Sequence, residues 1–471
     1  SYIESAFQLA EKTKSTVLKD YLLKTKTASR AEKLHLEQIQ NWSVEIAKEQ
    51  QKGEVADISK INKAIEKQNE LVLSLKKIES EKNPTEASEI KIESLFAKLD
   101  TESIILLNYF SGTEKTYCFV FESNTIRLQS FNNDKETMKG IWKFIDYFKD
   151  ADAILKDVRG YNHSGKVVYD VLKLPKGTDC KKLLIIPDGL LNFVSFEALI
   201  TEKSSTTNFA KMHYLVQDYA IGYNNSVAFY LNEVAVEKPR KNVLGIFPVF
   251  DKTKYALSFS KNEMASIKRN FEGRFFENEQ ATFDNFKANA SSYSILHLST
   301  HASSGDIDTA ASIKLYDQEV LYPQLYSLNI NPDLVVLSAC ETGIGKLYKS
   351  EGAMSVARGF QFAGARNLLF SLWKVNDFTT SVFMDYFYNY CEKGVSYFEA
   401  NHNAKLAFLN DKNISNAKKS PYYWSAFVYY GGVTSGEESF NYAYLIFGFI
   451  AVIGLLLIFT RFKKWKNYKK S

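Results

Sequence analysis

The sequence predicts an α/β protein in which a mostly parallel sheet, flanked by helices, follows a helical region and precedes a single transmembrane helix. Three patterns predict it. Amphipathic helical periodicity fills residues 1–98, apolar runs alternate with helical stretches over 101–432, and an uncharged apolar run lies near the C-terminus. Because 45% of the 471 residues are hydrophobic and 14% are aromatic, the chain can bury large cores, and wholesale disorder is excluded.

The N-terminal region, 1–98, has helical periodicity and no catalytic chemistry. Ser5–Leu18 places apolar side chains at helix-like spacing among charged ones. Further on, Gly53 interrupts an amphipathic stretch, Asp57 can cap the next helix, and the apolar stripe then continues to Asn83–Pro84. Two long amphipathic helices separated by so short a break are expected to pack as an antiparallel hairpin.

After residue 100 the pattern changes to strands. Ile104–Phe110 and Thr116–Phe121 are β-rich and are expected to form a hairpin, with aromatic-rich helices following to about residue 173. Leucine-rich and β-branched runs then alternate with helical stretches, which is typical of a parallel sheet covered on both faces. These runs are Leu183–Ile186, Asn242–Phe247, Ser294–Ser299, Leu334–Ser338 and Asn367–Ser371.

The C-terminus carries the clearest single signal. No charged residue occurs from Phe440 to Thr460. At about 1.5 Å per residue, a helix of this length crosses a hydrocarbon layer of about 30 Å. A buried core helix is the alternative, but such helices are rarely apolar on every face over this length. We expect a transmembrane helix over 442–460 and a basic tail over 461–471.

The charges beside this span predict its orientation. The tail contains basic residues and no acidic ones, whereas Glu437 and Glu438 precede the span. The positive-inside rule therefore places the tail in the cytoplasm and the body in the periplasm or outside the cell. Such a body needs an export signal, which is expected upstream because Ser1 begins within a helical pattern. The alternative is a tail-anchored protein with a cytoplasmic body.

Composition excludes several functional classes. The net charge is +5, and no basic and aromatic stretch suggests nucleic-acid binding. Four cysteines without a CxxC pair argue against a disulfide scaffold and a structural zinc site. Cys118, within a strand pattern, is most simply a small buried hydrophobe, and Cys180 and Cys391 are expected to be structural or incidental. No cofactor or metal is expected.

Two of the apolar runs lead into reactive side chains. The run 294–299 precedes His301, and the run 334–338 precedes Cys340. Catalytic groups gather beyond the carboxyl ends of parallel strands, so we expect both side chains at the same rim. A thiol needs a neighbouring base to become a nucleophilic thiolate near neutral pH, and an imidazole can serve. The spacing alone leaves open a buried cysteine and a hydrogen-bonded histidine.

His297 lies four residues before His301. On a helix this spacing would resemble a zinc-binding pair. In a strand the two residues are about 13 Å apart, too far to share one ion. Because the flanking residues favour a strand, His297 is expected to be structural and hydrogen-bonded.

The segments around these residues resemble the CHAT-domain cysteine peptidases, caspase-like proteins that usually follow tetratricopeptide repeats. His301 lies within His-Leu-Ser-Thr-His-Ala, and Cys340 lies within Leu-Ser-Ala-Cys-Glu-Thr-Gly. The resemblance extends over about 102–431, and Ala6–Lys14 resembles the last repeat helix before such a domain. Other segments match in family order: Leu184–Leu199, Glu351–Arg366, Ser371–Asp377 and Pro421–Gly431.

The resemblance implies a caspase-like sheet and a thiol endopeptidase without a cofactor. Cys340 would attack the scissile carbonyl, and His301 would transfer protons. The backbone N–H groups of Cys340 and Ala302 would meet the oxyanion. Ala302 departs from a family pattern in which glycine is frequent, but alanine keeps the N–H provided that the loop does not need a positive φ.

Three carboxylates near strand exits are ambiguous. Asp377 could face the pocket for the residue before the scissile bond and favour Arg or Lys there. The alternative is that Asp377 caps the helix starting at Phe378. Asp188 and Glu341 also lie beside strand exits, where carboxylates usually bond loop amides.

Two functions are compatible with these features. The first is a membrane-anchored, caspase-like cysteine endopeptidase that cleaves a protein substrate under the control of helical repeats, which bind a partner or hold the site shut. The second is a non-catalytic scaffold of repeats and CHAT domain at the membrane. The presence of both His301 and Cys340 favours the first.

Overall fold

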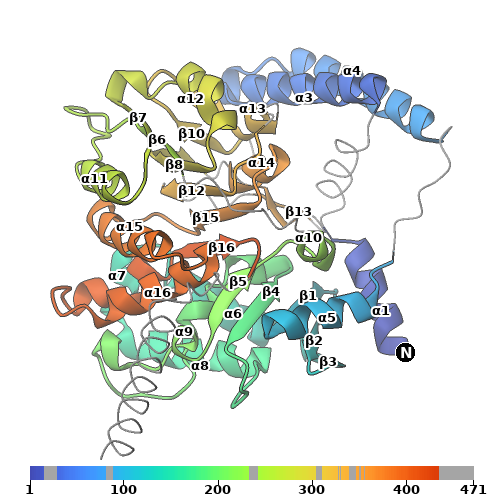
Figure 1. Cartoon of the computed structure of the whole chain (residues 1–471). Helices are drawn as coiled ribbons and strands as arrows, with labels where there is room; N and C mark the ends of the chain where they lie inside the picture. The colour runs from blue at the N-terminus through green and yellow to red at the C-terminus, as the bar shows by residue number, and fades with distance from the viewer. Residues whose placement is uncertain are drawn as a thin grey trace, which may run out of the picture.

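The computed structural model (Figure 1) describes residues 1–14, 29–80, 89–232, 242–303, 310–326, 328, 330–338, 346–348, 352–354 and 356–433. No helix formed by these residues is both long and apolar enough to cross a membrane. The predicted span 442–460 and the basic tail 461–471 lie outside the described residues. The membrane anchor therefore stays a prediction.

In the described part of the chain, eleven strands form one sheet with the order β3-β2-β1-β4-β5-β16-β15-β12-β8-β6-β7. The prediction of a mixed α/β fold around a large, mostly parallel sheet is confirmed. The strands are β1 (Ile104–Ser111), β2 (Lys115–Glu122), β3 (Thr125–Asn132), β4 (Lys182–Ile186), β5 (Ala220–Tyr223), β6 (Val243–Phe247), β7 (Gly273–Glu277), β8 (Ile295–Ser299), β12 (Leu334–Ser338), β15 (Asn367–Ser371) and β16 (Phe427–Tyr430).

Two small sheets accompany the large one. The first has the order β11-β10-β9 and the second pairs β13 with β14. Their strands are β9 (His301–Ser303), β10 (Ser312–Lys314), β11 (Glu319–Leu321), β13 (Lys346–Tyr348) and β14 (Gly352–Met354). The first small sheet matters for function because β9 begins at His301, directly beyond the end of β8.

The large sheet consists of two halves whose strands run in opposite directions. β1, β4, β5 and β16 are parallel, β16 and β15 are antiparallel, and β15, β12, β8, β6 and β7 are again parallel. The halves meet along the antiparallel pair β16 and β15. Next to this junction, β5 and β16 are joined at one paired position, Tyr223 opposite Tyr430, where the two rings stack 5.4 Å apart. The carboxyl ends of β8 and β12 therefore lie at the rim opposite the carboxyl ends of β1, β4 and β5.

One stretch predicted as helix is a strand. The structure forms β3 at Thr125–Asn132, before the first helix of this region. Ser123 and Asn124 both have positive φ, at 49° and 56°, and turn the chain so that β3 pairs back along β2. A two-residue turn of left-handed backbone is the usual hairpin connection, and here it ends at an asparagine, a residue that tolerates that conformation.

Helices follow most strands and cover the sheet (Figure 1). α11 packs against α15, and α15 packs against α16. The helices of this region are α6 (Lys135–Asp146), α7 (Ala151–Lys156), α8 (Val158–Leu172), α9 (Leu215–Asp218), α10 (Val227–Leu231), α11 (Ser260–Asn270), α12 (Phe283–Asn289), α13 (Tyr322–Tyr326), α14 (Val356–Phe362), α15 (Asp377–Glu392), α16 (Tyr397–Asn410) and α17 (Pro421–Trp424). Every residue of β6, β8 and β12 is buried, as expected for central strands covered on both faces.

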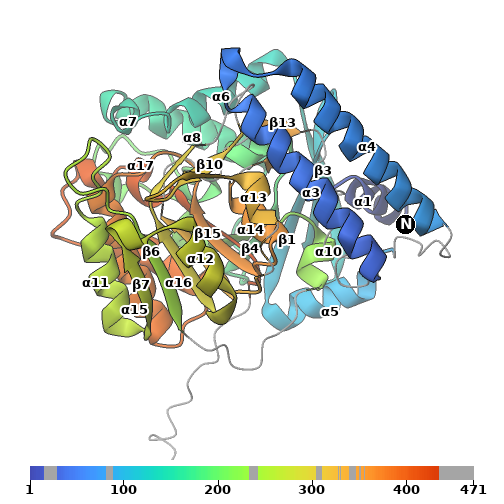
Figure 2. The ribbon, with the colours of Figure 1, turned by 90° about the horizontal axis from the view of Figure 1, so that it is seen from above.

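The predicted helical hairpin is present. α3 (Arg30–Gln50) and α4 (Ile58–Ser80) pack side by side across one end of the molecule, as Figure 2 shows. Gly53, with φ +59°, lies in the short break between them. The Asp57 carboxylate caps α4 by accepting hydrogen bonds from the backbone N–H groups of Ser59 and Lys60. The tetratricopeptide character of the region stays a prediction.

The first helix, α1 (Tyr2–Lys12), packs on the sheet rather than on the hairpin. The buried ring of Phe7 lies against Phe119 and Phe121 of β2, with ring centroids 5.7 and 4.9 Å away. A buried polar cluster adds direct bonds: Lys14 donates to Asn108 of β1, Asn108 donates to Glu11, and Glu11 accepts from the Val227 N–H at the start of α10. α5 (Ile92–Glu102) joins the same core.

Candidate active site

The two strands that lead to the predicted catalytic residues are neighbours. β8 and β12 are parallel, with Ser299 opposite Ser338, and the Thr300 N–H donates to the Ser338 carbonyl at 3.3 Å. His301 follows Ser299 by two residues, and Cys340 follows Ser338 by two residues. Cys340 itself lies outside the described residues. The contact between thiol and imidazole therefore stays a prediction, whereas the strand ends that lead to both residues lie side by side.

His301 is partly exposed at the start of β9, where it pairs with Lys314 of β10. Its Nε2 lies 2.8 Å from the backbone carbonyl oxygen of Tyr255. A carbonyl can only accept, so Nε2 carries the proton in this arrangement and Nδ1 holds the free lone pair. No hydrogen bond to Nδ1 comes from the described residues. The imidazole is thus oriented through one nitrogen, and the other keeps a lone pair that can accept a proton.

Ala302 follows His301 in β9, opposite Ile313 of β10. It is not among the described residues that have a positive φ. The condition for alanine at this position is therefore met, because its backbone does not need the conformation that favours glycine. The second proposed oxyanion donor, the N–H of Cys340, lies outside the described residues, as does Glu341.

Asp377 is the first residue of α15 and does not cap it. The cap is Asn376, whose Oδ1 accepts the Thr379 N–H at 3.1 Å, so the alternative interpretation of Asp377 as a cap is wrong. The Asp377 Oδ2 instead accepts the Phe259 N–H at 2.7 Å. Burial raises the pKa of Asp377, and the hydrogen bond from the Phe259 N–H opposes this effect. Among the described residues, no lysine or arginine forms an ion pair with this carboxylate.

The loop between β6 and α11 forms hydrogen bonds to both His301 and Asp377. Residue types alone did not reveal this role of the loop. Tyr255 supplies the carbonyl that orients His301, and Phe259 supplies the N–H that holds Asp377. The loop begins with left-handed backbone at Val249 (φ 50°) and Phe250 (φ 55°). Such conformations are costly for these residue types and cluster at functional sites. Only the position of this loop could have indicated its role, because β6 is parallel to its neighbour β8 and ends at the same rim.

His297 is structural, as predicted. It is fully buried in β8, with Nδ1 2.8 Å from the Tyr388 hydroxyl and Nε2 3.0 Å from Glu263 Oε1. Glu263 of α11 also accepts the Ser299 hydroxyl at 2.8 Å. This carboxylate was not predicted, because a glutamate within a charged helical stretch is usually exposed. The group ties α11 and α15 to the strand that ends at His301.

The remaining predicted residues lie as expected. Asp188, after β4, accepts the N–H groups of Ser111 and Gly189 at 2.7 and 2.9 Å. It therefore bonds loop amides, at the rim opposite His301. Cys118 is buried, and burial raises the pKa of its thiol to about 12. Cys391 is also buried, and Cys180 is partly exposed.

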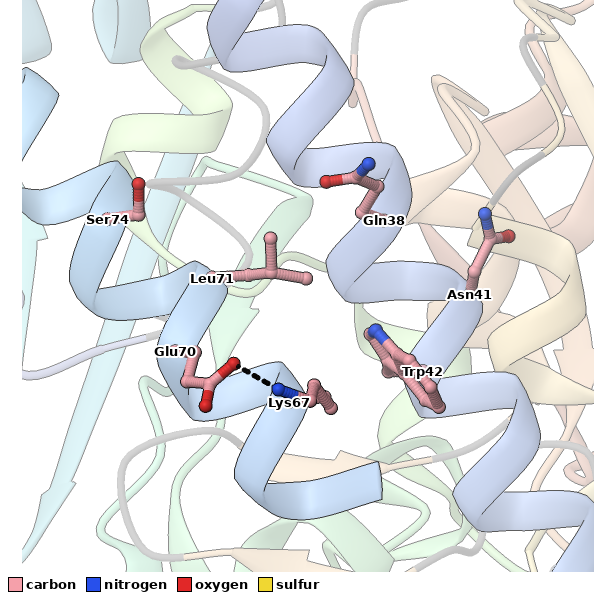
Figure 3. Close-up of a pocket in the computed structure, with 7 residues that line it drawn as sticks. All are labelled: Gln38, Asn41, Trp42, Lys67, Glu70, Leu71 and Ser74. Carbon is pink, nitrogen blue, oxygen red and sulfur yellow. Dashed lines mark hydrogen bonds and ion pairs between the residues drawn. The ribbon is translucent and has the colours of Figure 1, made fainter. Parts of the chain in front are cut away.

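A groove of about 530 Å³ lies between the two helices of the helical hairpin (Figure 3). Residues of α3 and α4 alone line it: Gln38, Asn41, Trp42, Lys67, Glu70, Leu71 and Ser74. Lys67 and Glu70 form an ion pair with each other at 2.8 Å. The Ser74 hydroxyl lies 3.2 Å from Nε2 of His35, a histidine that is not among the lining residues.

Comparison with known proteins assigns the family. Among solved structures, the chain is similar to the complex of Porphyromonas gingivalis RgpB pro- and mature domains, with 13% identity over 63% of this chain and 77% of that chain and a TM-score of 0.36. It is also similar to the Saccharomyces cerevisiae separase–securin complex, with 11% identity over 85% of this chain and 27% of that chain and a TM-score of 0.36. No curated protein sequence matches the chain. Residues 162–432 match the CHAT domain, and because this match spans more than half of the 471 residues, the chain belongs to the CHAT-domain family.

Proposed function

We propose that this protein is a membrane-anchored, caspase-like cysteine endopeptidase in which Cys340 is the nucleophile and His301 is the base. The register of β8 and β12 carries the proposal. Because Ser299 and Ser338 are paired, the chain leaves both strands at the same level, and each reactive residue follows two positions later. The free Nδ1 of an otherwise anchored imidazole supports the role of His301.

The reaction follows from these groups. Nδ1 of His301 accepts the thiol proton of Cys340, and the thiolate attacks the scissile carbonyl carbon. Backbone N–H groups of Ala302 and Cys340 stabilise the oxyanion. The intermediate collapses with cleavage of the C–N bond, and the protonated imidazole gives its proton to the leaving amine. Water, deprotonated by the same imidazole, then hydrolyses the thioester and restores the thiol.

The position of Asp377 supports a preference for substrates with arginine or lysine on the amino side of the scissile bond. Its carboxylate is half-buried, lies within electrostatic reach of His301, and has no basic partner in the described part of the chain. A partly desolvated carboxylate without a basic partner is strongly stabilised by a nearby cation. A basic substrate side chain can supply that cation.

The helices before the sheet are proposed to control the site. α1 touches β1, β2 and α10 through buried contacts of Phe7, Glu11 and Lys14. Movement of repeats attached to α1 would therefore act directly on the sheet. A protein partner bound by such repeats is the proposed source of that movement.

A peptide carrying a basic residue and a thiol-reactive group tests the catalytic proposal. We expect it to modify Cys340 in the parent protein, as located by mass spectrometry, and we expect His301→Ala to weaken the modification. Cys340→Ala should abolish the labelling, and Cys180→Ala, which removes a partly exposed cysteine elsewhere, should leave it unchanged. Equal labelling of Cys340 without His301 would contradict the proposal and favour the non-catalytic scaffold.

Protease accessibility in cells whose cytoplasmic membrane is intact, with any outer membrane removed, tests the membrane proposal. The six positive charges after residue 460 predict that a tag placed behind Lys463 is protected from external protease and becomes accessible after permeabilisation. A tag in the 203–206 loop of the body should already be cleaved before permeabilisation. Exposure of the tail before permeabilisation would overturn the orientation and favour the tail-anchored alternative.

A further inference from the structure

Two phenylalanine rings flank the Asp377 site and remain partly exposed. Phe259 and Phe378 are 38% and 42% exposed, and their ring centroids lie 5.2 Å apart in an edge-to-face arrangement. The aromatic pair (Phe259 and Phe378) is thus the apolar part of a surface whose polar part is a carboxylate. An edge-to-face pair leaves ring face available for a third group.

The aromatic pair is tied directly to the carboxylate. Phe378 follows Asp377 in the chain, and the backbone N–H of Phe259 donates to the Asp377 Oδ2 at 2.7 Å. The backbone of each phenylalanine is therefore directly next to Asp377, and the two rings contact each other. The bond from Phe259 occupies one carboxylate oxygen and leaves the other, Oδ1, for a ligand.

Rigid elements hold both rings. Phe259 is the residue before α11, and Phe378 lies in the first turn of α15. The two helices pack against each other and are joined by a 2.6 Å ion pair between Arg269 and Asp385. Groups that are fixed in this way can discriminate between ligands of similar charge.

We propose that the aromatic pair makes the site selective for arginine over lysine in the residue before the scissile bond. The inference rests on the proposed function and specifies its substrate. A guanidinium is planar and weakly hydrated, so it can donate to Oδ1 while its face lies on an aromatic ring. An ammonium is compact and strongly hydrated, and it loses more hydration for the same contact.

Matched peptides test this inference on the full chain. They differ only in the residue before the scissile bond, which is arginine, lysine or the neutral arginine analogue citrulline. We expect Phe259→Leu with Phe378→Leu to lower the ratio of kcat/KM for arginine to that for lysine by about 3- to 30-fold, the range of one to two cation–π contacts. Leucine keeps apolar volume and removes the ring face. Phe378→Tyr, with Phe259 intact, keeps an aromatic ring at this position. It should therefore keep the parent's ratio of kcat/KM for arginine to that for lysine.

The controls separate this inference from the proposed function. Trp142→Leu, which removes an exposed aromatic ring from α6, should leave the ratio unchanged. Asp377→Asn should lower both arginine and lysine rates by at least about 10-fold and bring them close to the citrulline rate. If the ratio of kcat/KM for arginine to that for lysine is the same with and without the aromatic pair, the inference is overturned and the proposed function is not. A parent protein that cleaves no peptide and shows no labelling of Cys340 overturns the proposed function and the inference with it.

Discussion

Replacing His301 by alanine is expected to lower kcat/KM for peptide hydrolysis by about 10²- to 10⁴-fold, the usual contribution of a positioned general base. Without the imidazole, the Cys340 thiol must ionise by itself, and a free cysteine thiol has a pKa of about 8.5. The leaving amine also loses its proton donor. The measurement is hydrolysis of a peptide with a basic residue before the scissile bond, by parent and variant at equal active-site concentration.

The pH dependence distinguishes loss of the base from loss of structure. In His301→Ala, the alkylation rate of Cys340 should climb as pH rises toward about 8.5, because the thiolate fraction then grows with pH. The matched control is His213→Ala, which removes a partly exposed histidine bonded to Thr201 on another part of the molecule. His213→Ala should keep the parent rate and pH profile. A His301→Ala enzyme with the rate of the parent would exclude His301 as the base.

The neighbouring strand ends of the candidate site could be predicted because the residue types of the sequence indicate them. Apolar runs end at His301 and Cys340, and parallel strands deliver such residues to one edge; the pairing of Ser299 with Ser338 agrees with that expectation. The orienting contacts could not be predicted in this way. Tyr255 acts through its carbonyl and Phe259 through its N–H. Every residue but proline has both groups, so nothing in the sequence marks these two.

The edge strand that was missed differs from the central strands that were found. The central strands β6, β8 and β12 are buried throughout, and their continuous apolar runs are visible in the sequence. The edge strand β7 is partly exposed, and its charged residues interrupt any apolar pattern. The opposite direction of the two half-sheets was also hidden, because it depends on one long-range antiparallel pairing between β15 and β16. It separates Asp188 from the rim of His301.

Buried charges were the least predictable feature. Lys405 lies on α16 and Glu197 lies in a short helical turn at 196–198, and both are only 1% exposed. In the sequence each looks like a solvated surface residue, since isolated charges are almost never fully buried. Only the fold reveals that they form a pair. Glu197 of this pair accepts a hydrogen bond from Tyr223 of β5, which pairs with β16, the strand at the junction of the two half-sheets.

Replacing Lys405 by methionine is expected to reduce the free energy of unfolding by about 3–5 kcal/mol, the cost of leaving one buried charge without its partner. Lys405 Nζ lies 2.5 Å from Glu197 Oε1, and the other Glu197 oxygen accepts the Tyr223 hydroxyl. Burial lowers the pKa of the Lys405 ammonium, and the Glu197 carboxylate opposes this effect. Without Lys405, the carboxylate keeps one hydrogen bond in a dry interior. Urea unfolding followed by tryptophan fluorescence measures the loss, because Trp373 and Trp424 are buried.

A second substitution tells a missing partner from a packing defect. Glu197→Gln combined with Lys405→Met removes both charges and still lets Tyr223 donate to a side-chain oxygen, so it should recover most of the lost stability. Lys412→Met, which changes an exposed lysine just after α16, should stay within about 0.5 kcal/mol of the parent. If Lys405→Met alone were as stable as the parent, the pair would not stabilise the junction. If the double variant were no better than Lys405→Met, the loss would come from packing around the lysine stem. β5 and β16 would then be held together by apolar contacts such as the stacked rings of Tyr223 and Tyr430.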